Sequence, residues 1–258
     1  MSRRPDYDVQ SLSRGLEIMT MLAEADRPIG ATEVAQSLGV DKSTAFRLLS
    51  TLVRHGFAVQ DEDTHRYRAG LRVVQLSRRI LDRTELRVVA KPWVRRLQEL
   101  TGESVHLAVF VGGNAVYIDK EDTGSSLNVR TEIGSLAPLH CSAIGKALIA
   151  EMPLEELQNA IPEEAMTRYT PRTITSMREL VPHLESTRER GYAFDDEEYE
   201  PGVRCIAAPV KGYRGHVETA VGISGPSVRV TLERVPALAA LVVETAGRIS
   251  HLVGFSAN

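Results

Sequence analysis

Cysteine and long apolar runs are both scarce in this sequence. Its 258 residues include two cysteines, Cys141 and Cys205, which lie far apart in the chain. Their isolation argues against a disulfide framework and against a zinc ribbon or finger. No apolar run approaches the length of a membrane-spanning helix, and the N-terminal MSRRPDYDVQ lacks the apolar segment of a signal peptide. We therefore expect a cytoplasmic protein with no membrane partner.

A net positive charge is also missing, since the chain carries a formal charge of -3. Residues 1–70 hold 9 Lys and Arg against 10 Asp and Glu, residues 71–100 hold 8 against 3, and residues 101–258 hold 14 against 21. Positive charge is thus concentrated in one short segment. A nucleic-acid partner is not excluded, because its binding depends on the local field.

The length and the hydrophobic content of 43% are sufficient for two domains, each with its own core. We predict a flexible arm (1–10), a winged helix-turn-helix domain (11–70), a linker helix (71–84) and an α+β domain (85–258).

The segment from Asp41 to Gly56, DKSTAFRLLSTLVRHG, predicts a helix with one apolar and one polar face. Its apolar side chains recur at helical spacing, at Ala45, Leu48, Leu49, Leu52 and Val53. Asp41 is a favoured N-cap residue, and Gly56 is suited to end the helix. Hydroxyl and cationic side chains fall on the other face. We interpret the segment as a DNA recognition helix, a merely solvated face being the alternative.

The preceding segments predict two further helices. The first is expected to begin at Ser11 or Ser13 and to run to about residue 25, with an inner face made of Leu12, Leu16, Met19 and Leu22. The second covers residues 31–38 and is separated from the recognition helix by Gly39. Small side chains at Ala35 and Ala45 allow the last two helices to cross closely, as a helix-turn-helix requires.

After Gly56, residues 57–60 and 65–68 alternate in polarity around a polar turn, which predicts a β-hairpin wing. We expect Ser43, Thr44 and Arg47 to contact base edges in the major groove. Phosphate contacts are assigned to Lys42, Thr51, His65, Arg66 and Arg68. The expected partner is double-stranded operator DNA.

Residues 71–84 predict a basic amphipathic linker helix, and another helix runs on to about residue 100. Pro92 would kink this second helix or lie in the first turn of a separate one. Its apolar side chains need a partner, which a second copy of the chain would supply: Val88, Val89, Trp93, Val94 and Leu97. We therefore predict a homodimer here, and two-fold pairing implies a palindromic operator.

Beyond Thr101 the apolar period becomes two. SVHLAVFV and AVYIDKE flank Gly-Gly-Asn, which predicts a hairpin, and SLNVRTEI (126–133) is expected to form a third strand. Helices are predicted over 142–151, 153–161, 176–190 and about 232–252, and further strands over VRCIAAPV and VETAVGIS. Hairpins interleaved with helices, without regular βαβ alternation, indicate an α+β fold with an antiparallel sheet and flanking helices.

Four blocks of the chain together resemble the IclR family of bacterial transcriptional regulators. They are VAQSLGVDKSTAFRLLSTL, LHCSAIGKALIA, RGYAFDDEEYEPGVRCIAAPV and AVGISGP, and the likeness extends over nearly the whole chain. The resemblance implies an N-terminal domain that binds operator DNA and a GAF-like C-terminal domain that binds a small effector. It also implies dimers that associate into homotetramers. We expect a repressor of a catabolic operon, although members of this family also activate.

The resemblance further implies a set of effector-binding residues. Asp195, Cys205 and Ser224 match polar positions around the ligand, and the rest of the site matches Ala137, Leu139, Ala143 and Ile144. Ser224 would donate to a carboxylate, and Asp195 would accept a hydroxyl or hold a proton. The helix that follows Ser142 adds unpaired N–H groups that suit an anion. Ile144 and Gly222 depart from the family pattern, which leaves room for an aromatic or branched acid.

Two other functions compete with this interpretation. Cys205 or Cys141 would act as the nucleophile of an enzyme or as a redox sensor, but neither lies in a nucleophile motif, and lone cysteines among apolar residues usually belong to a core. The other alternative is that the winged helix binds a protein and not DNA. Salt-sensitive binding to DNA would distinguish the two. His140 and Cys141 are adjacent on an extended segment and point apart. We expect no catalytic residue, no metal and no cofactor.

Overall fold

The computed structural model describes residues 8–83, 85–124, 131–213 and 215–255. It divides into two compact units, Met1–Arg83 and Thr84–Asn258, each of which is considered by itself. Within the described ranges, every helix is too short or too polar to cross a membrane.

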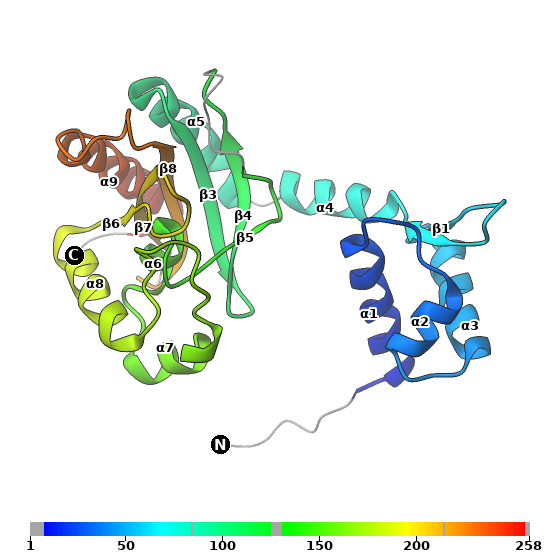
Figure 1. Ribbon diagram of the computed structural model, residues 1–258. Coiled ribbons are helices and arrows are strands. Elements are labelled where there is room, and N and C mark those ends of the chain that lie inside the picture. Colours follow the sequence, from blue (N-terminus) through cyan, green and yellow to red (C-terminus); the bar gives the residue numbers. More distant parts are fainter. Residues whose placement is uncertain (1–7, 84, 125–130, 214, 256–258) are drawn as a thin grey trace. The chain divides into compact units, whose positions relative to one another are not determined.

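The first unit combines helices with a short antiparallel hairpin (Figure 1). Its elements are α1 (Gln10–Glu24), α2 (Ala31–Ser37), α3 (Lys42–Arg54), β1 (Ala58–Gln60), β2 (Tyr67–Ala69) and α4 (Arg72–Arg83). Helices α1, α2 and α3 and the hairpin share one core, to which Ile18, Val34, Leu49 and Tyr67 belong. Backbone hydrogen bonds between Tyr67 and Ile29 attach the hairpin to the α1–α2 connection. The winged helix-turn-helix predicted from the sequence is confirmed.

The turn between α2 and α3 follows the predicted pattern. Ala35 and Ala45 are both buried, so the two helices approach closely. Gly39 adopts a φ of +61°, a left-handed conformation that favours glycine. Asp41 is the N-cap of α3, as expected. These local signals fix where α3 begins and how it packs on α2.

The start of α1 differs from its prediction. Residues 1–7 of the predicted arm lie outside the described residues, and α1 already begins at Gln10. Val9 occupies the N-cap position and makes no side-chain cap. Ser11 and Ser13 lie inside the helix, and the Ser13 hydroxyl donates to Asp8. The predicted serine cap is therefore wrong.

The inner face of α1 was also assigned only in part. Ile18 and Leu22 are buried in the core, whereas Leu12 and Leu16 are 62% and 57% exposed. Helical spacing groups apolar residues on one side but does not show how far along the helix the core extends. The first turns of α1 project beyond the residues that would cover them.

The described strands of the second unit form a six-stranded antiparallel sheet in the order β5-β4-β3-β8-β7-β6. They are β3 (Ser104–Val111), β4 (Asn114–Glu121), β5 (Leu136–Ala137), β6 (Ala193–Asp196), β7 (Val203–Lys211) and β8 (Val217–Pro226). The predicted strand over 126–133 falls largely outside the described residues, and β5 forms later in the chain. The α+β fold itself is as predicted.

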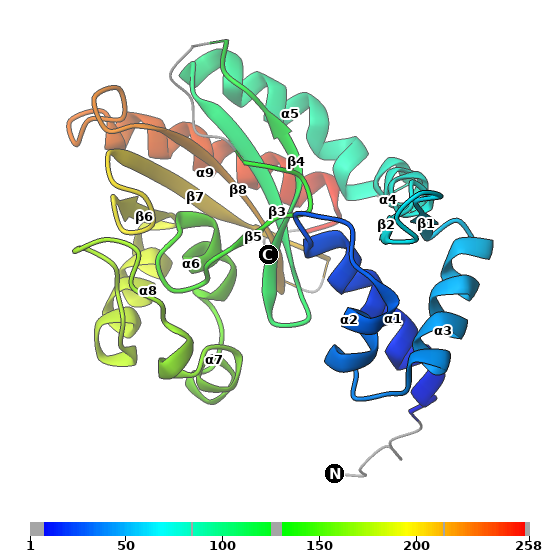
Figure 2. The same ribbon diagram turned by 45° about the vertical axis from the view of Figure 1, so that its right-hand side comes forward.

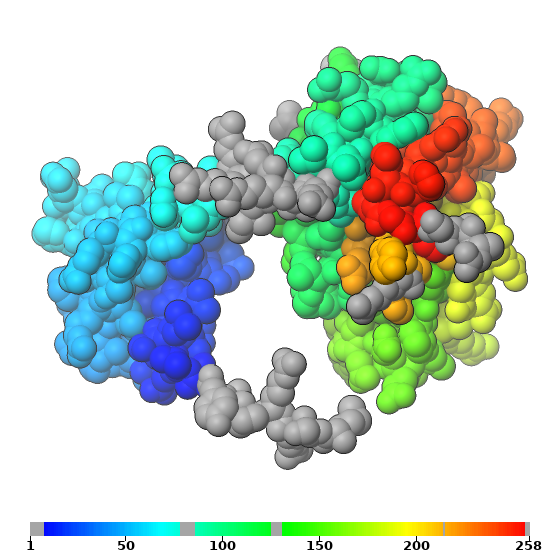
Figure 3. Space-filling view, turned by 180° about the vertical axis from the view of Figure 1, so that it is seen from behind, coloured from blue at the N-terminus to red at the C-terminus, as the bar shows by residue number. Residues whose placement is uncertain are grey.

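Helices cover both faces of this sheet (Figures 1 and 2). They are α5 (Glu85–Thr101), α6 (Ala143–Ile149), α7 (Leu154–Ala160), the 3₁₀ helix η1 (Glu163–Ala165), α8 (Met177–Arg190) and α9 (Val235–Leu252). α5 and α9 pack against each other on one face, and Figure 3 shows them side by side at the surface. α6 lies on the opposite face, backed by α8.

The apolar face of α5 finds a partner within its own chain. Val94 and Leu97 are fully buried, and α5 packs on α9, β3 and β4. Pro92 lies inside α5 and starts no separate helix. Val88 remains 59% exposed. Using Val94 and Leu97 to predict a dimer was therefore wrong, because the sheet and α9 already cover them.

Candidate functional site

The outer face of α3 presents polar and cationic side chains to solvent. Ala45 and Leu49 are fully buried beneath it, as the helical spacing predicts. The exposed side chains of α3 include Lys42, Ser43, Arg47, Thr51 and Arg54. Phe46, which the sequence analysis did not single out, is 52% exposed on the same helix. Its position outside the apolar stripe of the helix was the sequence signal that this aromatic side chain would be exposed.

The first turn of α3 is organised by Asp41. Its carboxylate accepts a hydrogen bond from the backbone N–H of Thr44 at 2.8 Å. The hydroxyls of Ser43 and Thr44 donate to the same carboxylate, at 2.5 and 2.7 Å. These bonds, the one from Ser43 first, hold the pKa of Asp41 well below its usual range. The two hydroxyls predicted to contact bases are thus held in place by the cap.

The hairpin places its basic residues differently from one another. His65 and Arg68 are exposed. Arg66 instead donates from Nη1 to Glu33 Oε1 at 2.8 Å and to the Pro28 carbonyl at 3.1 Å. Arg27 binds the other oxygen of Glu33 at 3.0 Å, and these arginines, Arg27 first, lower the pKa of Glu33. Arg66 therefore ties the hairpin to α2.

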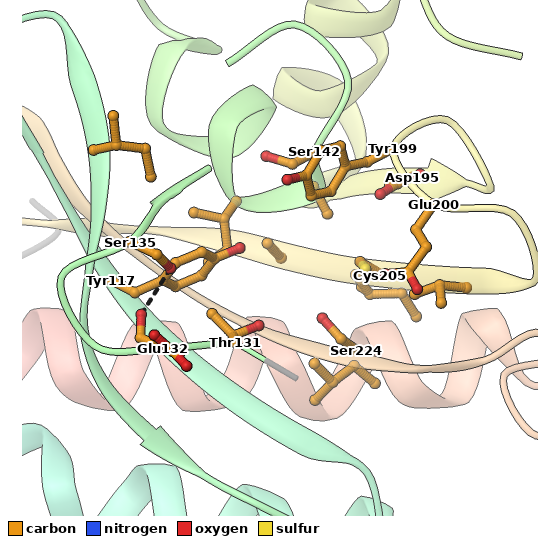
Figure 4. A pocket seen from close by; sticks show the side chains of 17 residues that line it. Tyr117, Thr131, Glu132, Ser135, Ser142, Asp195, Tyr199, Glu200, Cys205 and Ser224 are labelled. Atoms are coloured by element: carbon orange, nitrogen blue, oxygen red, sulfur yellow. Dashed lines mark hydrogen bonds between the residues drawn. The ribbon is translucent and has the colours of Figure 1, made fainter. Parts of the chain in front are cut away.

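The second unit contains a cavity of about 550 Å³ between the sheet and α6 (Figure 4). The predicted effector residues that line it are Ala143, Ile144, Asp195, Cys205 and Ser224. The other two, Ala137 and Leu139, lie in the adjoining hydrophobic core. The structure thus gathers the three polar members of the predicted set around one space.

Other polar residues line the cavity that the sequence analysis did not assign to it. They include Tyr117, Thr131, Glu132, Ser135, Ser142, Tyr199 and Glu200. Figure 4 shows Asp195, Tyr199 and Glu200 gathered at one end and Tyr117, Glu132 and Ser135 at the other. The acidic segment DDEEYE was the only sequence signal for Tyr199 and Glu200. Nothing in the alternation of β4 marked Tyr117 as a cavity residue.

Strand register explains why Asp195, Cys205 and Ser224 converge. Asp195 on β6 is paired with Cys205 on β7, which is paired with Ser224 on β8. Directly paired residues of antiparallel strands point to the same face of a sheet. Ser104 on β3, paired with Ser224, extends this polar row by one more strand. Asp195, Cys205 and Ser224 therefore form a polar row along the part of the sheet that lines the cavity.

A buried ion pair lies beside this row. Lys146 on α6 is 1% exposed, and its Nζ donates to the two carboxylate oxygens of Glu198 at 2.6 and 2.7 Å. The Phe194 carbonyl accepts from the same Nζ at 2.6 Å. Burial raises the pKa of Glu198, and the adjacent ammonium opposes that rise. Two side chains 52 positions apart thus join α6 to the loop after β6.

Asp195 itself is almost completely buried. One of its oxygens accepts a hydrogen bond from the backbone N–H of Glu198 at 2.7 Å. Burial raises the pKa of Asp195 to about 7, although the charge of Lys146 acts in the opposite direction. The carboxyl group at the cavity floor therefore changes its charge near neutral pH.

The start of α6 is capped from within the chain. Ser142 Oγ accepts a hydrogen bond from the backbone N–H of Gly145 at 3.0 Å and donates to the Pro138 carbonyl at 2.6 Å. The Gly145 N–H is therefore not one of the unpaired N–H groups predicted at the start of this helix. Ser142 lines the cavity with an oxygen that is already engaged.

Comparisons with known proteins agree with both halves of this structure. Residues 11–62 match the IclR helix-turn-helix domain, and residues 78–251 match the bacterial transcriptional regulator IclR C-terminal domain. The chain belongs to the IclR family of transcriptional regulators. Among its IclR relatives, the regulator KdgR of Escherichia coli is 35% identical over 99% of this chain and 96% of its own length. The E. coli repressor AllR is 35% identical over 96% of this chain and 92% of its own.

Solved IclR structures share the fold. The IclR regulator from Alicyclobacillus acidocaldarius superposes with a TM-score of 0.83 at 26% identity, covering 96% of this chain and all of that one. A regulator from Rhodococcus sp. RHA1 gives a TM-score of 0.80 at 30% identity, covering 95% and 98%.

As an IclR regulator the protein is not an enzyme, and its cysteines fit that conclusion. Burial raises the pKa of both thiols, Cys205 and Cys141, and the nearby carboxylate of Asp195 adds to the effect. Thiols held in the protonated form are poor nucleophiles. His140 contacts the Thr167 carbonyl at 3.0 Å and not Cys141. Among the residues with described positions, no group of His, Cys, Asp or Glu could hold a metal ion.

Proposed function

We propose that this regulator represses a catabolic operon by binding a palindromic operator through α3, and that a small organic acid in the cavity controls its occupancy. The observation that carries the DNA-binding half is the exposed polar face of α3 over a fully buried apolar one. Repression is supported by relatives named as repressors, among them AllR and the acetate operon repressor of Salmonella typhimurium.

Base and phosphate contacts are divided along the helix and the hairpin. Ser43, Thr44 and Arg47, in the first half of α3, read base edges in the major groove. The phosphates are held by Lys42, Thr51, His65, Arg66 and Arg68. Arg66 also keeps its bond to Glu33, so its larger contribution is to fix the hairpin against α2.

Self-association is supported by exposed apolar side chains in the first unit. Val9, Leu12 and Leu16 of the α1 region and Leu71 and Val74 near the start of α4 are each more than half exposed. Apolar side chains that together form a contiguous exposed patch commonly mark an interface. We propose a homodimer formed through this unit, which associates further into a homotetramer through the second.

The effector is proposed to be a carboxylate or aromatic acid that contacts Asp195, Cys205 and Ser224. The cavity volume of about 550 Å³ lies within the range of small-ligand sites. Hydroxyl donors at Ser224 and Tyr117 suit a carboxylate. If effector binding and operator binding are linked, the effector changes the protein's affinity for the operator by the same factor by which the operator changes its affinity for the effector.

The test begins with DNA selected from a random pool by the wild-type protein. Arg47→Ala is expected to lose about 1–3 kcal/mol of preference for the selected DNA over random DNA, because it removes a bidentate base contact. Fluorescence anisotropy measures both affinities, and circular dichroism checks the fold. Arg178→Ala, which removes an exposed cation from α8, is the matched control. Unchanged preference in Arg47→Ala would contradict the assignment of α3.

A further inference from the structure

Among the described residues, Asp195 has no uncommitted cation as a counter-ion. The cation that acts on this carboxyl group is Lys146. Its Nζ already donates to both oxygens of Glu198 and to the Phe194 carbonyl. Because Glu198 neutralises Lys146, an ionised Asp195 would leave a net negative charge in a buried site.

The other groups that face Asp195 are neutral or acidic. They come from the segment before α6, from β4, from β7 and from the loop after β6, and are Cys141, Tyr117, Cys205, Glu198, Tyr199 and Glu200. Among the described residues that line the cavity, none is a lysine, an arginine or a histidine. A carboxylate that entered this cavity would therefore meet like charge if Asp195 were ionised.

We propose that the effector binds as a monocarboxylate together with one proton, which Asp195 carries and donates to a carboxylate oxygen of the ligand. This inference rests on the proposed function and specifies how its cavity recognises an anion. The proton comes from solvent, no covalent bond of the ligand changes, and the pair keeps one negative charge where two would otherwise meet. A hydrogen bond from a carboxylic acid to a carboxylate is short and strong.

The arrangement of the oxygens supports this role. Asp195 accepts a hydrogen bond from the Glu198 N–H at 2.7 Å and is also hydrogen-bonded to the Tyr199 N–H and to the Cys205 thiol, and these bonds fix the orientation of the group. The side chain lies on the cavity floor beside Cys205 and Ser224 (Figure 4). Burial raises the pKa of Asp195 to about 7, so the proton is available at neutral pH without a large cost. A dianionic ligand would bring a second charge for which the described lining offers no partner.

The first experiment needs no ligand. Infrared difference spectra of the wild type and Asp195→Asn, recorded from pH 4 to 9 with ¹³C-labelled aspartate, follow the carboxylic C=O band of Asp195. We expect the band to disappear with a midpoint near pH 7. Ionisation of Asp195 below pH 5 would overturn the proposal, whatever the protein does on DNA. Failure of sequence-specific DNA binding with a normal Asp195 titration would contradict only the proposed function.

The second experiment uses benzoate and benzylamine as probes of matched shape and opposite charge. Calorimetry at pH 8 in two buffers of different ionisation enthalpy is expected to show uptake of about one proton per benzoate bound. Benzoate affinity should fall roughly 100-fold between pH 6 and pH 9, because only the protein with a protonated Asp195 binds benzoate. Benzoate binding without proton uptake, or tighter binding of benzylamine than of benzoate at pH 6, would overturn the proposal.

Variants test whether the proton on Asp195, and not a cationic side chain, accounts for the binding of the anion. Asp195→Asn mimics the protonated acid and is expected to bind benzoate with an affinity that does not change with pH. Glu200→Gln, at the same end of the cavity, should retain the wild-type pH dependence. Arg130 lies outside the described residues, and Arg130→Gln should leave proton uptake intact. Loss of uptake in Arg130→Gln, with Asp195 still titrating, would show that a cation matches the ligand and would contradict the proposal.

Discussion

Asp41 and Asp195 are the same residue type in opposite environments, one in each unit of the molecule. Asp41 lies at the exposed start of α3, where hydroxyl and N–H donors stabilise its charge. Asp195 lies on a buried strand, where desolvation opposes its charge. The DNA-binding unit thus uses as a structural cap a carboxylate whose pKa is lowered by its hydrogen bonds. The effector unit holds a group whose charge is adjustable.

Among the variants that test this contrast, Lys146→Met is expected to have the largest effect. Removing the ammonium leaves Glu198 buried without its partner, which should cost about 3–5 kcal/mol of unfolding free energy. Trp93 is the only tryptophan and lies in α5, so its fluorescence during urea denaturation reports on the second unit. The double variant Lys146→Met/Glu198→Met should recover much of the loss. Arg178→Met on α8, an exposed cation of the same unit, is the control, and a loss there as large as in Lys146→Met would contradict the explanation by a buried ion pair.

Asp195→Asn should remove a loss of stability that the wild-type protein undergoes as pH rises. Because the pKa of Asp195 is raised on folding, its contribution is fully favourable below about pH 4 and falls as pH rises to about 7. Asp195→Asn avoids that loss, so at pH 8 it should be more stable than wild type by up to about 4 kcal/mol, with little difference at pH 4. Urea denaturation at the two pH values measures the difference. Equal effects at both would contradict a raised pKa.

Close packing at the cavity should make Gly145→Ala destabilising by about 1–3 kcal/mol. A Cβ at Gly145 would lie 2.3 Å from the Pro138 carbonyl oxygen and 2.6 Å from Leu139 Cα. Gly247 lies within α9 with open space around it, so Gly247→Ala should stabilise by about 0.5–1 kcal/mol. The same fluorescence assay compares the two, and effects of equal sign would argue against tight packing at α6.

The smallest expected effect is that of Asp41→Asn. Its folded pKa lies below the ordinary value, so the charge contributes stability above about pH 4, and that contribution is lost as pH falls further. Asn also caps helices well, which limits the loss near neutral pH. Hydrogen exchange of the Thr44 amide at pH 7 and pH 3 measures it. A difference that grew in acid would have the wrong sign for a cap held by charge.

The parts that the sequence predicted well depend on neighbours along the chain. Asp41 and its Thr44 partner are three positions apart, and the stripe containing Ala45 and Leu49 follows from helical geometry. The assignment failed at Leu12 and Leu16, because spacing cannot show where the core ends. Local patterns therefore defined α3 completely but α1 only in part.

The cavity required contacts that no local pattern contains. Asp195, Cys205 and Ser224 were assigned through family resemblance, and their convergence depends on the register of three strands. Tyr117 reaches the same space from a strand almost 80 positions earlier in the chain. Lys146 and Glu198 lie in two separate blocks of the family resemblance, but nothing in the sequence indicated that they form an ion pair with each other.

The hydroxyls at the start of α3 impose a condition on the bases that we propose they contact. Ser43 and Thr44 have already given their hydrogens to Asp41, so only lone pairs face outward. Of the base edges in the major groove, the amino groups of cytosine and adenine offer the hydrogen that such oxygens can accept. Arg47, a pure donor, needs the opposite and suits guanine. Each half of the proposed palindromic operator should therefore contain a guanine near a base that presents an amino group.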